Sequence, residues 1–222
     1  MKSNVLEIAG NSELSEKIKN IIEQEINLLD KYETRDTLKT SEIHMCPRKL
    51  LYKSIKPSKN GFTLDDFNNQ FAIKKWAKLL KYYVLGTNIV LSDCNYGIVG
   101  NGDIILDIEG CNVILKIQSL NADDFNKIVK NGPRKKHILE LIANKWLAEI
   151  ENGLLIYENR DNFEFEVFQI HASIYSVHII ESIKKKCVSL MKHKTKGELI
   201  SRPYKEESKE CKMCDYSSEC WL

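Results

Sequence analysis

The chain has 222 residues, of which 43% are hydrophobic and 29% are charged, and its formal net charge is +2 at neutral pH. This length and composition are ordinary for a soluble globular protein with one sizeable core, and no stretch approaches the roughly 20 apolar residues of a membrane span. Seven cysteines, an odd number, argue against a secreted disulfide framework, so we expect an intracellular protein in a reducing compartment.

The N-terminal part, residues 1–39, is predicted to be a helical appendage ahead of one domain that spans residues 40–222. Asn11 or Ser12 can cap a helix that runs to about Lys31. One stripe of this helix is apolar: Leu14, Ile18, Ile21, Ile22, Leu28 and Leu29. We expect this stripe to pack on its own domain, and the alternative is a docking surface for a partner protein.

Two further helices precede the predicted sheet. The first carries Cys46 and ends before Pro57, and its Pro47 suits only the first helical turn or a kink. The second helix spans residues 64–83. The side chains of this helix that we expect to face a core are Phe71, Trp76, Leu79 and Leu80.

The middle of the chain changes to the two-residue period of β-strands. Strands are predicted at residues 88–92, 96–99, 103–108, 113–119, 153–157 and 163–170, with a hairpin connection at 109–112. Helices are predicted at residues 122–131, 137–150 and 172–194, and a polar tail follows the last of them. The order of helix, strand meander, helix and strand predicts an α/β fold with a mixed sheet.

Four cysteines are divided between the two ends of the predicted domain. Cys46 stands alone upstream, whereas Cys211, Cys214 and Cys220 fall within ten residues. Four thiolates can complete a tetrahedral zinc site or hold a [4Fe–4S] cluster. Structural zinc sites usually take their ligands as two close pairs, so the one-plus-three division is less usual for zinc, and both groups stay open on spacing alone. The remaining thiols are expected to pack as small hydrophobic side chains: Cys94, Cys111 and Cys187.

These motifs resemble the iron–sulphur branch of the RecB-like nuclease family, which includes the CRISPR-adaptation exonucleases and the AddB-type nucleases. The matching residues are Cys46-Pro-Arg at one end and Cys211-x-x-Cys214-x-Tyr-x-x-x-Cys220-Trp at the other. The resemblance covers residues 40–222 and implies a PD-(D/E)XK core. In such a core a central mixed sheet is flanked by helices, and a [4Fe–4S] cluster clasps the two ends.

The resemblance also implies where a nuclease site belongs, and there the chain departs from the family. The family places an Asp after a Gly-x-x-Asp turn, Glu-x-Lys on the next strand, and often Gln-x-x-x-Tyr on the following helix. Asp103 follows such a turn, but Lys116 stands at the Glu position and Gln118 at the Lys position. Glu140 falls near the Gln position and Asn144 near the Tyr position. Because Mg²⁺ prefers carboxylate and water oxygens, we expect the Lys116 ammonium to repel it and to pair with Asp103.

We therefore expect an iron–sulphur protein with a degenerate nuclease site that binds no Mg²⁺ or Mn²⁺. Its expected role is a nucleic-acid-binding or structural subunit of a DNA-processing or transcription assembly. Its expected partner is DNA, single-stranded or at strand ends, or that assembly, without a membrane. One alternative is an active exonuclease with ligands shifted to Asp107, Glu109 or Glu140, and another is a protein-interaction module without DNA binding.

Clusters of lysine are the candidates for contact with nucleic acid, although solvated helix faces produce the same pattern. The residues proposed for this contact are Lys135, Lys136, Lys184, Lys185 and Lys192. We expect them to converge on the side of the molecule that holds Asp103. A lysine- and asparagine-rich chain with a drifted site also suits a viral or mobile-element protein.

Overall fold

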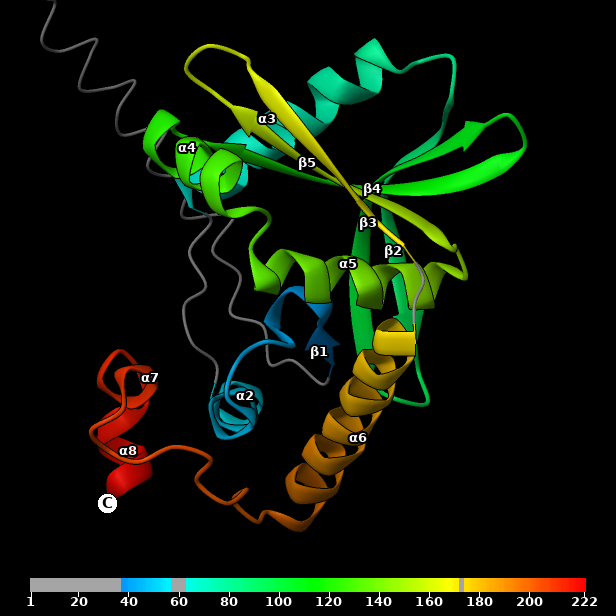
Figure 1. Ribbon diagram of the computed structural model, residues 1–222. Helices are drawn as coiled ribbons and strands as arrows, with labels where there is room; N and C mark the ends of the chain where they lie inside the picture. Colours follow the sequence, from blue (N-terminus) through cyan, green and yellow to red (C-terminus); the bar gives the residue numbers. More distant parts are fainter. Residues whose placement is uncertain (1–36, 57–62, 172–173) are drawn as a thin grey trace, which may run out of the picture.

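A mixed sheet of six strands with helices on both faces forms the centre of the molecule (Figure 1). The computed structural model describes residues 37–56, 63–171 and 174–222, and the predicted helix of residues 11–31 lies outside them. The strands are β1 (Leu38–Lys39), β2 (Val84–Asp93), β3 (Ile98–Ile108), β4 (Cys111–Leu120), β5 (Asn152–Asn159) and β6 (Phe165–Ile170). The helices are η1 (Thr40–Glu42, a 3-10 turn), α2 (Pro47–Ile55), α3 (Leu64–Leu79), α4 (Ala122–Asn131), α5 (Lys135–Ala148), α6 (Ile174–Lys196), α7 (Lys209–Lys212) and α8 (Ser217–Trp221). None of the helices within these ranges is long and apolar enough to cross a membrane.

The arrangement of strands around β3 creates the place where the candidate site lies. One edge of β3 pairs antiparallel with β2. The other edge pairs in parallel with β1 at residues 98–99 and antiparallel with β4 at residues 104–108. Residues 100–103 of β3 lie between these two ladders. The β3–β4 ladder ends at Leu115, and β4 then continues beside β5, to which it is parallel. β6 is antiparallel to β5 at the far edge.

Successive residues of the central strands point to opposite faces of the sheet, and helices cover both of these faces. Ile114 packs in a cluster with α4 and α5 side chains, whereas the next residue, Leu115, packs in a cluster with Ala72 and Ile73 of α3. The α5 face of the sheet therefore receives Asp103, Lys116 and Gln118, which have the same parity along β3 and β4 as the residues of the first cluster.

The two ends of the predicted domain lie side by side. α6 packs against α5 and α2 in a third apolar cluster that includes Leu38 and Cys187, and the segment with α7 and α8 returns beside α2 (Figure 1). Arg48 Nη1 of α2 donates to the carbonyl oxygen of Ile200 at 2.8 Å. Because Leu38 is buried and pairs with β3, the sheet begins before the predicted division at residue 39.

Two expectations about buried side chains were wrong. Ala72, Ile73 and Trp76 of α3 and its C-cap residue Leu80 pack on the sheet. Phe71 and Leu79 are 63% and 67% exposed. At 3.6 residues per turn, Phe71 lies about 160° around the helix from Ile73, on the side away from the sheet. Among the remaining thiols, Cys187 is buried as expected. Cys94 and Cys111 are exposed at the turns beside β3.

Candidate functional site

Two buried carboxylates and the largely buried Lys116 ammonium converge on the α5 face of the sheet. Lys116 Nζ, from β4, lies 3.2 Å from Asp103 Oδ1 of β3 and 3.0 Å from Glu140 Oε1 of α5. The expected pairing of Lys116 with Asp103 is thus confirmed. Glu140, which stands near the Gln position of the nuclease pattern, is a second carboxylate in contact with the same ammonium.

The place of Asp103 follows from the divergence of β3 and β4. The last ladder pair between these strands joins Ile104 to Leu115, so the amide of Ile117 lies beyond the ladder. Asp103 Oδ2 accepts that amide at 2.7 Å. One oxygen of the Asp103 carboxylate therefore takes the place of a strand partner for β4. The other oxygen contacts the Lys116 ammonium.

The electrostatics of the three groups keep a positive charge at Lys116. Burial raises the pKa of Asp103, and the Lys116 ammonium and the Ile117 amide oppose that shift. Burial lowers the pKa of Lys116, but the Asp103 and Glu140 carboxylates outweigh burial and raise it above its ordinary value. A cation that is covalently part of the chain therefore already lies between the two carboxylates.

The other carboxylates considered as shifted ligands lie elsewhere. Asp107 and Glu109 are exposed in the β3–β4 turn, where Asp107 Oδ1 accepts the Gly110 amide at 2.8 Å. Four residues of strand separate Asp107 from Asp103, which is roughly 13 Å at about 3.3 Å per residue. The Gln118 side chain donates to the Ile117 carbonyl oxygen at 2.9 Å, within its own strand, rather than to Asp103.

Asn144 fixes α5 against β3, one turn after Glu140. Its Nδ2 donates to the Asn101 carbonyl oxygen at 2.9 Å, and the side chain is fully buried. A Cβ at Gly100 would lie 2.3 Å from Asn144 Oδ1 and 2.8 Å from Thr40 Cγ2, so the close approach requires glycine. Residues four apart share a helix face, so this contact also directs Glu140 toward Lys116.

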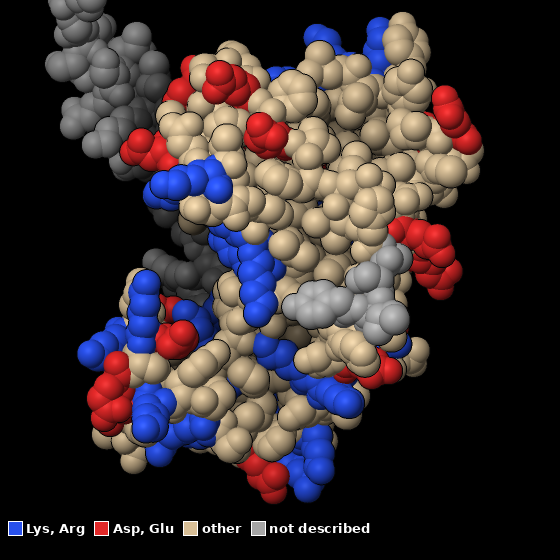
Figure 2. All heavy atoms as spheres, viewed as in Figure 1, with Lys and Arg blue, Asp and Glu red and all other residues tan. Residues whose placement is uncertain are grey.

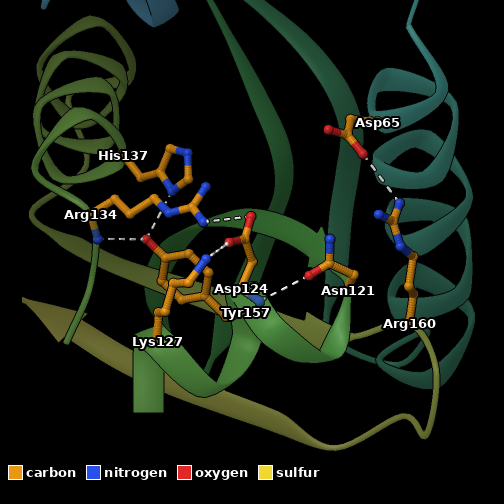
Figure 3. A network of polar contacts seen from close by, with 8 residues as sticks. All are labelled: Asp65, Asn121, Asp124, Lys127, Arg134, His137, Tyr157 and Arg160. Carbon is orange, nitrogen blue, oxygen red and sulfur yellow. Dashed lines mark hydrogen bonds and ion pairs between the residues drawn. The ribbon is translucent and has the colours of Figure 1, made fainter. Parts of the chain in front are cut away.

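A second buried contact joins the start of α5 to β5 (Figure 3). The Tyr157 hydroxyl lies 2.8 Å from His137 Nδ1 and accepts the Arg134 amide at 3.1 Å. Burial, reinforced by the charges of Lys136 and Arg134, lowers the pKa of His137 to about 3. Burial also raises the pKa of Tyr157 to about 12. His137 is therefore uncharged at neutral pH, and its hydrogen bond with the Tyr157 hydroxyl joins α5 to β5.

The predicted cysteine ligands line one cavity of about 220 Å³: Cys46, Cys211, Cys214 and Cys220. Cys46 is the N-cap of α2, and Pro47 occupies its first turn as predicted. Two interactions hold the C-terminal segment against α2. Lys49 Nζ lies 2.9 Å from Asp215 Oδ2, and the rings of Tyr52 and Tyr216 stack at 5.4 Å.

The charged side chains of this cavity wall are mostly cations. Arg48, Lys49 and Arg202 line it beside Glu210, so cations prevail in its wall. Among the described residues, no three His, Cys, Asp or Glu side chains lie close enough together to hold a single metal ion. One water needs only about 10–15 Å³ of such space, so the cavity has room for a group larger than one ion.

Three side-chain donors in the wall of this cavity were missed by sequence reasoning. Arg48 Nε, Tyr216 Oη and Trp221 Nε1 are buried without a hydrogen-bond partner, and the three residues all line the cavity. The sequence does contain a signal for Tyr216 and Trp221, since they are large aromatic residues in an otherwise polar segment. Such side chains usually need a buried environment.

The five candidate lysines occur in two settings. Lys135 and Lys136 are exposed at the start of α5, while the adjacent Arg134 pairs with Asp124 at 2.9 Å (Figure 3). The other three line a depression of about 460 Å³ on α6: Lys184, Lys185 and Lys192. Figure 2 shows Lys and Arg side chains from the middle of the view down to its lower part, with Asp and Glu side chains among them. Whether both settings serve one surface stays a prediction.

Comparisons with known proteins define the fold. No protein-family model matches the sequence, and no curated protein matches it. The crystal structure of SSO0001 is similar with a TM-score of 0.58 at 20% identity, covering 91% of this chain and 96% of that chain. An alkaline exonuclease (LHK-Exo) from Laribacter hongkongensis has a TM-score of 0.58 at 8% identity, covering 73% of this chain and 89% of that chain. A phage-related exonuclease from Haemophilus somnus 129PT has a TM-score of 0.50 at 10% identity, covering 72% of this chain and 94% of that chain. The chain therefore has the mixed α/β fold that these exonuclease structures share.

Proposed function

We propose that this chain is a nuclease-fold protein that has lost cleavage and acts as a DNA-binding or structural subunit of a DNA-processing or transcription assembly. The observation that carries the proposal is the Lys116 ammonium between Asp103 and Glu140, 3.2 Å and 3.0 Å from their oxygens. The similarity in fold to two exonucleases, one of them also solved in complex with dAMP, supports DNA as the partner.

The chemistry of phosphodiester cleavage explains why this ammonium matters. A divalent metal polarises the phosphate and lowers the pKa of the attacking water. Mg²⁺ requires near-octahedral oxygen ligands and keeps several waters. An ammonium neutralises the same carboxylates but offers no open position for a water or a phosphate oxygen. The triad therefore serves to hold β3, β4 and α5 together rather than to activate water.

A cleavage assay with single-stranded DNA and either Mg²⁺ or Mn²⁺ tests the loss of activity. We expect no cleavage by the unmodified protein and no stabilisation by millimolar Mg²⁺. The double substitution Lys116→Glu with Gln118→Lys restores the family pattern and is expected to recover weak metal binding. Robust cleavage by the unmodified protein that disappears in Asp103→Ala would refute the proposal in favour of an active exonuclease.

DNA binding is tested by fluorescence anisotropy with a labelled single-stranded oligonucleotide across a range of salt concentrations. Binding through lysine and phosphate releases counterions, so the affinity should fall steeply with salt. Lys135→Glu with Lys136→Glu should weaken binding and flatten this slope. The matched control is Lys74→Glu with Lys78→Glu, since both side chains are exposed on α3, across the sheet from α5. Equal effects of the two pairs would contradict a DNA surface at the start of α5.

A protein-interaction role without DNA binding is favoured by a different observation. Phe163 and Phe165, at the β5–β6 hairpin, are 64% and 54% exposed. Phe165 packs edge-on against Trp76 of α3 at 5.1 Å, and the Lys75 ammonium lies 4.5 Å from the Phe163 ring centroid. Exposed aromatic side chains gathered in this way are common at protein interfaces. Undetectable DNA binding at moderate salt would favour this role.

The four-cysteine cavity is proposed to hold a [4Fe–4S] cluster, with zinc as the alternative. When bound, such a cluster would join the two ends of the domain through thiolate bonds and carry one-electron redox chemistry. A closed zinc site at about 2.3 Å per bond would hold its sulphur atoms roughly 3.8 Å apart. The cavity of about 220 Å³ between the cysteines supports the larger group.

A further inference from the structure

We propose that Tyr216 Oη, Trp221 Nε1 and Arg48 Nε donate hydrogen bonds to the sulphur atoms of the group held by the four cysteines. These bonds would set how easily that group accepts an electron. The inference rests on the proposed cluster and deepens it, because it assigns the side chains that tune it.

The location of the unpartnered donors carries the inference. Buried polar atoms are almost always hydrogen-bonded, and one left without a partner costs about 1–3 kcal/mol. Within the described residues, five buried side-chain atoms have no partner, and three of the five belong to residues that line the cysteine cavity. The other two are the side-chain oxygens of Asn101 and Asn144, at the contact between β3 and α5.

The three atoms at the cavity share one chemical character. Indole and guanidinium nitrogens can only donate a hydrogen bond, and a phenol hydroxyl donates readily. Their common partner must therefore be an acceptor. Thiolate and sulphide sulphur atoms are anionic acceptors, and hydrogen bonds to the sulphurs are one of the factors that set the potential of an iron–sulphur cluster.

Neighbouring contacts fix these donors in place. Arg48 Nη1 is held by the Ile200 carbonyl oxygen at 2.8 Å, which leaves Nε for another acceptor. The Arg202 guanidinium lies 4.4 Å from the Trp221 ring centroid, and its Nε donates to the Cys220 carbonyl oxygen at 2.9 Å. Tyr216 is held by its stacking on Tyr52. The three donor atoms themselves are buried, and hydrogen bonds made away from water are stronger than in solvent.

The electrochemical consequence has a definite sign. Reduction adds one electron to the cluster and makes its sulphur atoms more negative. Hydrogen bonds to those atoms stabilise the reduced form more than the oxidised form, so the donors raise the reduction potential. Removing a donor should therefore shift the potential to more negative values.

The stacked tyrosines provide a matched pair for the test. Tyr216 has an unpartnered hydroxyl, whereas the Tyr52 hydroxyl donates to the Glu219 carbonyl oxygen at 3.2 Å. Both residues line the cavity, and their rings are 9° from parallel. Tyr216→Phe and Tyr52→Phe each remove one hydroxyl and retain the ring. Redox titration of the cluster-loaded full chain with electrochemical mediators, followed by visible absorption and electron paramagnetic resonance, then gives the potential of each protein.

We expect Tyr216→Phe to shift the potential to more negative values and Tyr52→Phe to leave it unchanged. Trp221→Phe should shift the reduction potential in the same direction as Tyr216→Phe. This second variant provides the test if Tyr216→Phe does not retain its cluster. Iron and sulphide analysis of the unmodified protein separates the two levels of the proposal. Zinc in place of iron overturns the proposed cluster itself. A full complement of iron with unchanged potentials, or an equal shift in Tyr52→Phe, overturns only the role of the donors.

Discussion

The Lys186 ammonium on α6 donates a hydrogen bond at 2.5 Å to the carbonyl oxygen of Met45, the residue before Cys46. The same ammonium donates to the Ile43 carbonyl oxygen at 2.6 Å. A side chain from the helix that follows the sheet thus fixes the segment that leads to the first cysteine. The geometry of the cysteine cavity therefore depends on α6 as well as on α2 and the C-terminal segment.

Lys186→Met is expected to lower the free energy of unfolding by about 1–3 kcal/mol, because two carbonyl groups lose a charged donor. It should also lower the amount of metal retained on purification, since the Cys46 backbone is less constrained. Thermal unfolding and metal analysis measure the two effects. Lys185→Met, at an exposed position on the same helix, is the control. Equal loss in both variants would mean that the contact does not support the cavity.

Cys46→Ser is expected to abolish metal retention and to destabilise the domain. A site formed only on folding contributes its binding free energy to stability. We expect about four irons per chain in the unmodified protein handled without oxygen, and a brown colour. Cys111→Ser is the control, because Cys111 is exposed at the β3–β4 turn. Iron and zinc analysis with thermal unfolding provides the measurement, and unaltered metal content in Cys46→Ser would exclude this thiol as a ligand.

Lys116→Met should leave Asp103 and Glu140 as buried carboxylates without a counter-charge. We expect a loss of roughly 3 kcal/mol in the free energy of unfolding at neutral pH, since breaking a buried pair strands a charge. The two carboxylates should then bind a divalent cation, so Mn²⁺ should raise the melting temperature of the variant but not of the unmodified protein. Equal stabilisation of both proteins by Mn²⁺ would show that the ammonium does not block the site.

The buried His137 makes the fold sensitive to acid. Its pKa is about 3 in the folded protein against an ordinary value of 6.5, so the unfolded chain binds the extra proton between these values. Stability from this group is fully present above pH 6.5 and declines as the pH falls toward 3, by up to about 1.4 kcal/mol per pH unit. Urea unfolding between pH 7 and pH 4.5 should show a shallower decline in His137→Gln. The exposed His178→Gln should behave like the unmodified protein, and parallel curves for all three would contradict the assignment.

Much of the fold could be predicted from periodicity, and the exceptions have physical reasons. The sequence allowed Lys116 and Asp103 to be placed on the same face of the sheet, because successive residues of β4 alternate between two buried faces. The predicted strands 96–99 and 103–108 are one continuous β3, since Gly100 and Gly102 serve close packing rather than a turn. The short helices α7 and α8 carry too few residues for helical periodicity. α8 is tied to α2 by the Tyr52 hydroxyl, which donates to the Glu219 carbonyl oxygen.

The composition of the cysteine site was predictable, but its supporting contacts were not. Four cysteines in a one-plus-three spacing predict a shared site, and all four line one cavity. The partners of Lys186 are backbone carbonyl groups, which no side-chain motif reveals. Phe165 and Val167 on β6 are exposed, because alternation along a strand indicates two different faces without saying which face is covered.

The return of the C-terminal segment to α2 has a consequence for the order in which the protein is made and folded. Lys49 and Asp215 are 166 residues apart along the chain. Closing a loop of that length in an unfolded chain costs about 4.5 kcal/mol of entropy by the logarithmic scaling, before any contact offsets it. The strands and α6 shorten this distance once they have folded, and Cys220 is synthesised only after all of them. We therefore expect the cysteine cavity to assemble after the sheet, which would leave its thiols accessible to metal in newly made protein.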